Sequence, residues 1–196
     1  MTGLRFEGRL HGVLAMMLLF AWSSCRDAGV AGDPSRFTFD YEFNYEVPDV
    51  PPDSLINVRV RTSQTIDRKA QEVWSVISNF GAASEYLGPA IQSSEGQGSG
   101  PDAERTLVLA GGKMSVREKV IQQVDPRMIM SYEMISGDLP LQDYRETLRV
   151  RITPEGGAEV SAATDFVTRA QQARAMYDLA RQRHASLYLS LIEGAQ

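Results

Sequence analysis

Residues 168–193 have the sequence TRAQQARAMYDLARQRHASLYLSLIE, the only long uninterrupted helical pattern that follows the N-terminal segment. Its apolar residues recur at spacings of three and four, which predicts a helix with one buried face. That face consists of Ala173, Met176, Tyr177, Ala180, His184, Leu187, Tyr188, Leu191 and Ile192. Thr168 and Gln171 form a capping-box pattern, and Gly194 predicts the end of the helix. Such a helix would be about 35 Å long, so a sheet has to wrap it.

The sequence before this helix alternates in the manner of β-strands. Ile56, Val58 and Val60 predict a first strand, and Asp67 is the expected N-cap of the helix that comes next, with a second short helix over 82–87. Five further strand patterns, separated by turn residues, cover 105–110, 114–124, 128–135, 144–153 and 159–167. Their short connections predict an antiparallel meander. The predicted fold class is therefore α+β, with a curved antiparallel sheet wrapped around the long C-terminal helix.

The first 24 residues differ in kind from the rest. Arg5 and Arg9 precede the apolar run Val13–Trp22, which is shorter than the roughly 20 residues of a membrane span, so residues 1–24 are predicted to be a signal peptide. Cys25, the only cysteine, stands where a bacterial lipobox has its lipidated residue. Lipidation of Cys25 and plain cleavage nearby remain as alternatives. We expect an exported protein, periplasmic or lipid-anchored, that meets a membrane only through the signal or a lipid on Cys25.

Residues 25–53 are predicted to be a tether with an aromatic-rich strand or arm. Aromatic and polar residues alternate over 37–47, which is the pattern of a strand. This segment is either a strand added to the edge of the sheet or an arm that lies across the domain. Because Pro48, Pro51 and Pro52 separate it from the next strand pattern, the folded domain is predicted to cover 54–196.

Composition excludes several classes of function. The net charge is −5, so nucleic acid is not an expected partner. A single cysteine excludes an intramolecular disulfide. If His11 is removed with the predicted signal peptide, His184 is the one histidine left, so we expect no site built on several Cys or His ligands and no metal. There is no dinucleotide-binding or P-loop glycine pattern, and we expect no cofactor.

Strand parity places two carboxylates on the predicted inner face of the sheet. The even positions of 128–134 are large and apolar, and the same parity puts Glu118 and Glu146 on the inner face. An unpaired ionised carboxylate is costly to bury. These residues therefore either line a pocket or lie near the rim of the sheet and pair with Arg105, Lys113 or an arginine of another strand. If Glu118 is a desolvated pocket charge, replacing it with Gln should spare the fold or stabilise it.

Other inner-face residues allow two interpretations. His184 lies on the apolar stripe of the long helix, where it either faces a cavity or is a hydrogen-bonded core residue. Tyr132 and Met134 share the inner face of one strand with two further methionines. Such a strand suits a cavity that accepts varied apolar shapes, or it is ordinary core.

Three passages are similar to a known family. These are AQEVWSVISNFG (70–81), EKVIQQVD (118–125) and SGDLPLQDYR (136–145), and they resemble the START/Bet v 1-like (SRPBCC) superfamily. Within it the chain is most similar to the polyketide cyclase/dehydrase and lipid-transport group and more distantly to the plant abscisic acid receptors. The resemblance covers about residues 55–191. It implies a helix-grip fold with a cavity between the concave face of the sheet and the long helix.

The resemblance also implies two gate loops and several pocket residues. The gate residues are Ala110, Gly111, Gly112 and Lys113 in one loop and Leu139, Pro140 and Leu141 in the other. Glu118 and Tyr144 match residues that bind polar groups of the ligand in the receptors, whereas Gln92 replaces their ligand-binding lysine. The gates also depart from the receptor motifs, so abscisic acid itself is not implied. Replacing Gly111 and Gly112 with Ala should change stability by less than about 1 kcal/mol, provided that neither needs a positive φ.

We expect an exported binding or carrier protein for a small apolar or amphipathic ligand, such as a lipid, a quinone or a polyketide-like ring. The candidate ligand-binding residues are Glu118, Tyr144, Tyr132, Met134, Glu146, Gln92 and His184. One alternative is a cyclase or dehydratase that uses Glu118 and Tyr144. Another is a periplasmic interaction module with a vestigial cavity.

Overall fold

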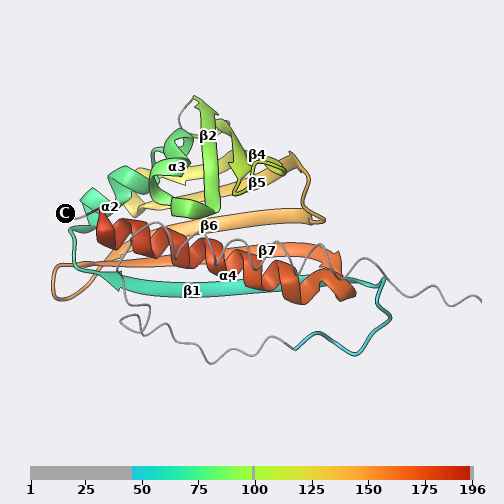
Figure 1. The fold of residues 1–196 in the computed structure, drawn as a ribbon. Coiled ribbons are helices and arrows are strands. Elements are labelled where there is room, and N and C mark those ends of the chain that lie inside the picture. The colour runs from blue at the N-terminus through green and yellow to red at the C-terminus, as the bar shows by residue number, and fades with distance from the viewer. Residues whose placement is uncertain (1–45, 99, 195–196) are drawn as a thin grey trace, which may run out of the picture. The chain divides into compact units, whose positions relative to one another are not determined.

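A computed structural model describes residues 46–98 and 100–194. The predicted signal peptide, Cys25 and residues 37–45 of the aromatic segment lie outside these ranges. The domain consists of a seven-stranded antiparallel sheet in the order β1-β7-β6-β5-β4-β3-β2 and a long C-terminal helix (Figure 1). The strands are β1 (Leu55–Ile66), β2 (Ile91–Gln97), β3 (Glu104–Leu109), β4 (Ser115–Val124), β5 (Ile129–Gly137), β6 (Gln142–Ile152) and β7 (Ala158–Arg169). The helices are α2 (Ala70–Ile77), α3 (Ala83–Tyr86) and α4 (Ala170–Glu193), with short 3-10 turns η2 (Phe80–Ala82), η3 (Gly88–Ala90) and η4 (Asp125–Arg127). The predicted α+β class is confirmed.

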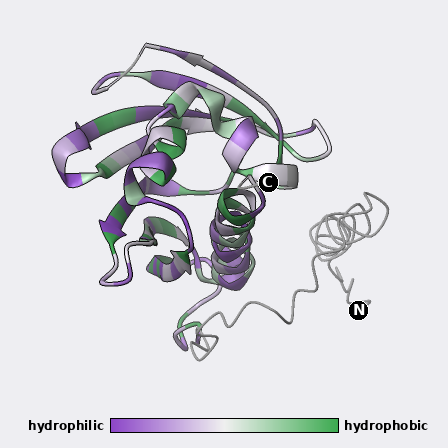
Figure 2. Ribbon diagram, turned by 90° about the vertical axis from the view of Figure 1, so that its left-hand side faces the viewer, coloured by the Kyte–Doolittle hydropathy of each residue, from purple (hydrophilic) through white to green (hydrophobic). Residues whose placement is uncertain are grey.

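The predicted inner face is the buried one. Val116, Glu118 and Val120 of β4 are buried, as are Tyr144 and Glu146 of β6, while the residues between them are more exposed. Figure 2 shows bands of different hydropathy along the strands. Ile152, which has the same parity, is 60% exposed because β6 ends there.

Strand β2 is not among the predicted strands. Its sequence, IQSSEGQ, has no β-branched or aromatic residue after Ile91, and it forms one edge of the sheet. Gly96 allows the backbone of β2 to approach Gly81 so closely that a Cβ on Gly96 would collide with the Cα of Gly81. Close backbone approach, and not side-chain pattern, therefore places this strand.

The long helix α4 lies where the sequence predicts it, but its start is capped differently. No side chain caps it, and the hydroxyl of Thr168 donates to the carbonyl of Pro140 instead, at 2.8 Å. The first helical N–H groups, from Ala170 and Gln171, donate to the carbonyls of Ser54 and Pro52 at 2.8 and 3.0 Å. Likewise, α2 begins after Lys69 and not after the predicted cap Asp67. Over the described ranges, no helix is both long and apolar enough to cross a membrane.

Candidate ligand-binding site

Four charged side chains meet between the inner face of the sheet and α4. They are Arg105 of β3, Glu118 of β4, Glu146 of β6 and Arg183 of α4, and we call them the buried charge cluster. The first three are 1% exposed as residues, and the Arg183 side chain is 14% exposed. Strand alternation aims the first three inward, and the length of the arginine side chain lets α4 reach them.

Glu118 is held by both arginines. Its Oε2 accepts hydrogen bonds from Nε of Arg105 at 2.7 Å and Nη2 of Arg183 at 3.3 Å, and its Oε1 accepts from Nη1 of Arg183 at 2.9 Å. Arg105 is one of the partners that the sequence left open for Glu118. The pair does not lie at the rim of the sheet, as that interpretation expected, but is buried inside the fold.

Arg105 is wholly enclosed. Its Nη1 donates to the carbonyl of Phe80 and the hydroxyl of Tyr86 at 3.0 and 2.7 Å. The guanidinium carbon also lies 4.0 Å from the ring centroid of Phe80 and 4.8 Å from that of Tyr132, distances at which the ring faces attract a cation. Its Nη2 lies 2.7 Å from Oε2 of Glu118 but makes no well-aligned hydrogen bond.

Glu146 links the cluster to Tyr144 and His184. The Tyr144 hydroxyl donates to Oε2 of Glu146 at 2.5 Å, and Nε of Arg183 lies 3.5 Å from the same oxygen. Nε2 of His184 lies 4.0 Å from Oε1. Nearby, Nη2 of Arg183 donates to the hydroxyl of Tyr132 at 3.0 Å. The cluster therefore joins β3, β4, β5, β6 and α4 in one polar network.

The pairing determines the charge states. Burial alone would raise the pKa of Glu118, but the charges of Arg183 and Arg105 outweigh it, and the pKa is lowered. Burial likewise opposes ionisation of Glu146, yet Arg183, His184 and the Tyr144 hydrogen bond lower its pKa. Burial raises the pKa of Tyr144 well above its ordinary value. Both carboxylates are therefore ionised and the tyrosine keeps its proton.

His184 is a hydrogen-bonded core residue that faces the cluster from one side. Its Nδ1 and Nε2 lie 2.8 Å from the hydroxyls of Thr62 on β1 and Thr164 on β7. Burial lowers the pKa of His184, although Glu146 opposes this shift. The imidazole is therefore neutral near pH 7, and it fastens α4 to the two strands beneath it.

The ends of β4 and β5 that adjoin the two predicted gate loops are hydrogen-bonded to each other. The backbone N–H and the hydroxyl of Ser115 donate to Oδ2 of Asp138 at 2.8 and 3.2 Å, and the N–H of Asp138 donates to the carbonyl of Ser115. Gly111 and Gly112 have φ angles of +89° and +67°. Both glycines therefore need a positive φ, contrary to the condition under which alanine would be tolerated. We expect Gly111→Ala and Gly112→Ala to strain the loop by about 1 to 2 kcal/mol each.

The remaining predicted residues lie at varied distances from the cluster. Met134 is partly buried and is the register partner of Glu118 on the neighbouring strand. Leu139 and Leu141 pack against the core, whereas Lys113 is exposed. Gln92 is exposed on β2, and a Cβ on Gly112 would lie 2.8 Å from its Oε1, so it belongs to the first gate. The structure brings together Glu118, Tyr132, Tyr144, Glu146 and His184 and leaves Gln92 and Lys113 outside.

Arg183 was missed by the sequence analysis, although a signal for it exists. Arg183 follows Ala180 by three residues and precedes Leu187 by four, so it lies at the margin of the buried stripe. An arginine at such a position is normally solvated. The signal for Arg183 is the inward parity of Glu118 and Glu146, because two buried carboxylates need a cation nearby.

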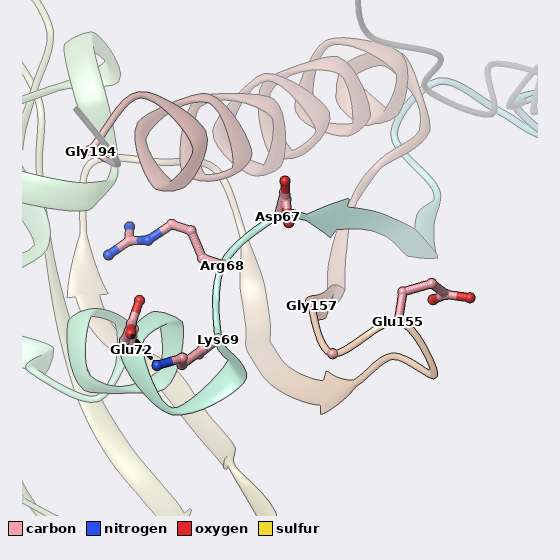
Figure 3. Close-up of a pocket in the computed structure, with 8 residues that line it drawn as sticks. Asp67, Arg68, Lys69, Glu72, Glu155, Gly157 and Gly194 are labelled. Atoms are coloured by element: carbon pink, nitrogen blue, oxygen red, sulfur yellow. Dashed lines mark ion pairs between the residues drawn. The ribbon is translucent and has the colours of Figure 1, made fainter.

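The side chains of the cluster and its tyrosines lie between the sheet and α4. Two hollows open elsewhere. One, of about 540 Å³, lies at the C-terminal end of α4 and is lined by polar residues that include Asp67, Arg68 and Glu155 (Figure 3). The other, of about 290 Å³, lies on the outer face of the sheet. Within the described part of the chain, no three His, Cys, Asp or Glu residues are arranged to hold a metal.

Comparison with known proteins gives one family and many similar folds. The family described as "Polyketide cyclase / dehydrase and lipid transport" matches residues 57–185. An uncharacterized protein of Bacillus thuringiensis is 21% identical with a TM-score of 0.62, over 70% of this chain and 98% of its own. The Zhui aromatase/cyclase of a Streptomyces species is 14% identical with a TM-score of 0.63, over 71% and 94%. Norcoclaurine synthase of Thalictrum flavum is 17% identical with a TM-score of 0.61, over 74% and 98%. No curated protein matches the sequence.

Proposed function

Because the chain belongs to the polyketide cyclase/dehydrase and lipid-transport family, whose fold binds small apolar ligands, we propose that it is an exported, non-catalytic binding protein for a neutral amphipathic molecule. The ligand would lie between the sheet and α4, with its polar end at the buried charge cluster. Its apolar part would replace contacts among the partly buried side chains of the gate region, Met134, Leu139 and Leu141.

The observation that carries the non-catalytic assignment is the saturation of Glu118. A general base needs a free lone pair and a pKa near the working pH. Glu118 has both oxygens bonded to arginines and a lowered pKa. Tyr144, the expected acid partner, donates its hydroxyl hydrogen bond to Glu146 and has a raised pKa. Neither residue is prepared for proton transfer near neutral pH.

Neutrality of the ligand follows from the charges of the cluster. Two arginines and two ionised glutamates cancel, and His184 adds no charge near pH 7. A charged ligand would bring an uncompensated charge into this buried region. A hydroxyl or carbonyl group needs only hydrogen bonds, and Arg183, the more exposed of the two arginines, is the donor that such a group meets first.

A set of ligands of equal length tests this proposal. The full chain would be loaded with an apolar fluorescent probe and titrated with decanol, decanone, decanoate and decylamine. We expect the alcohol and the ketone to displace the probe about tenfold more tightly than the two ions. Weaker binding of the neutral pair than of either ion would overturn the ligand class.

Neighbouring residues of β5 provide a matched pair of variants. Met134 lies on the inner face, while Ile135 is 41% exposed and has the opposite parity. Met134→Trp should block the ligand space and abolish displacement of the probe. Ile135→Trp should leave it unchanged. An equal loss of probe displacement in both variants would count against the proposed ligand space. Turnover of a bound ketone that disappears in Glu118→Gln would count against a non-catalytic protein.

Export is a separate part of the proposal. It is supported by the sequence of Arg5, Arg9, the apolar run 13–22 and Cys25. Mass spectrometry of the protein from its own cell envelope should find Cys25 acylated at the mature N-terminus, or a free N-terminus close to it. An intact N-terminal segment on a cytoplasmic protein would contradict export.

A further inference from the structure

The outer face of the sheet carries a row of alternating charges. Successive cross-strand neighbours from β1 to β3 are Arg59, Asp165, Arg145, Glu133, Lys119 and Glu104. Opposite charges that face each other across strands are favourable. The closest of these pairs joins Nε of Arg59 to Oδ1 of Asp165 at 2.6 Å. Two further charges of the row pair with residues beside it, Lys119 with Asp102 and Glu104 with Arg117.

Arg61 and Arg149 lie outside this row. The register neighbour of Arg61 on β7 is Ala163, and the neighbours of Arg149 are Ser161 and Ile129. Arg61 reaches Asp165 only at 3.7 Å, and Asp165 already holds Arg59. Arg149 forms no ion pair within residues 46–98 and 100–194. Arg149 thus keeps its positive charge for an external partner, and Arg61, which shares one carboxylate with Arg59, has its charge only partly matched.

The hollow of about 290 Å³ lies between these two arginines. Its lining includes Arg61, Arg149, Thr147, Ser161 and Ala163. The β1 and β6 backbones lie two strand spacings apart, about 10 Å, and the two arginines are offset by about 7 Å along the strands. Arginine side chains can span this gap because the residues between them, Ser161 and Ala163, are small.

We propose that this hollow binds a phosphate group between the guanidinium groups of Arg61 and Arg149. Guanidinium groups match phosphate oxygens with paired N–H donors, and a site at the surface leaves the rest of the molecule in solvent. The hydroxyl of Ser161 lies in the same lining and adds a third donor. The site is on the opposite face of the sheet from the buried charge cluster, so it is independent of the proposed ligand space. Free phosphate and a phospholipid headgroup both carry the required chemistry.

Two measurements on the full chain test the site. The Nε–H signals of arginine would be followed by NMR while phosphate replaces chloride at constant ionic strength. The signals of Arg61 and Arg149 should shift together. Sedimentation with phosphatidylcholine vesicles, with and without phosphatidylglycerol, distinguishes the sources. Tighter binding to the phosphatidylglycerol vesicles would identify a headgroup, and binding of phosphate alone would identify a soluble ligand. Binding to neither would overturn the proposal.

Variants supply the controls. The double variant Arg61→Gln, Arg149→Gln should weaken phosphate binding about tenfold or more, because both guanidinium groups are lost. The matched double lysine variant keeps the charge and should give an intermediate loss. Arg151→Gln is the control on the same strand, since Arg151 faces Glu159 across the sheet and not the hollow. It should change the affinity less than about twofold. An equal effect of Arg151→Gln would show general charge attraction in place of a site.

Discussion

The two faces of the sheet use arginine in opposite ways. On the inner face, the Arg105 side chain is 0% exposed and its charge is matched by Glu118. On the outer face, the Arg59 side chain is 69% exposed and its pair with Asp165 stays in contact with water. A buried arginine without its partner is costly, whereas a solvated one loses little. The inner arginines are therefore fixed by folding, and the outer ones are available to a ligand.

The largest effect should come from removing the inner counterion. Glu118→Gln leaves Arg105 buried beside a neutral amide, so the free energy of unfolding should fall by about 3 to 5 kcal/mol. This replaces the expectation from sequence that the change spares the fold, because that expectation assumed an unpaired carboxylate. Urea unfolding measures the loss. Glu104→Gln, on the outer row, is the control and should lose less than about 1 kcal/mol. Similar losses for the two variants would erase the distinction between the faces.

Acid should weaken the inner cluster next. Burial lowers the pKa of His184, and the arginine charges lower those of Glu118 and Glu146 against the effect of burial. The unfolded chain therefore binds more protons than the native chain. Stability is fully present above the unfolded pKa of each group, about 6.5 for His and about 4.3 for Glu, and is lost as the pH falls towards the folded values. Urea midpoints measured from neutral pH to about pH 4 should fall throughout. His184→Gln should flatten the upper part of this curve, and an unchanged curve would contradict a buried neutral imidazole.

A smaller loss of stability is expected from removing a neutral hydrogen bond between the inner face of the sheet and α4. Thr164→Val keeps the shape of the side chain but removes its hydrogen bond to Nε2 of His184. The loss should be about 1 to 2 kcal/mol, since the imidazole is left with an unpaired nitrogen. Ser161→Val lies on the same strand with outward parity and should change stability by less than about 0.5 kcal/mol. Thermal unfolding of both variants provides the comparison, and a greater loss for Ser161→Val would contradict it.

The smallest effect should come from the outer row itself. Arg59→Ala removes an exposed partner of Asp165 and should cost no more than about 0.5 to 1 kcal/mol, with less loss at high salt. Urea unfolding at two salt concentrations measures this dependence. A loss as large as that of Glu118→Gln would mean that the outer charges also maintain the fold.

Sequence alone predicts the parts of the structure that depend on local periodicity. The stripe of α4 and the inward parity of β4, β5 and β6 follow from spacing, and they placed Glu118, Glu146 and His184 correctly on buried faces. The arrangement around Glu118 depends on contacts far apart in sequence, such as the pairing with Arg183, 65 residues away. Strand β2 and the backbone caps of α4 were missed for the same reason. Their determinants are backbone approaches and carbonyl groups of distant segments, which no side-chain pattern reveals.

The pairing of the first strand with the last sets the order in which the chain can fold. Every register partner of β1 lies on β7, about 100 residues later, for example Arg59 with Asp165 at a separation of 106. Contacts of such long range slow folding, because the intervening loop must close before they form. A ribosome makes β7 about 100 residues after β1, so β1 has no register partner over that interval. Until β7 emerges, the first strand therefore stays unpaired, and an unpaired chain is the state in which a protein can still be threaded through a narrow channel.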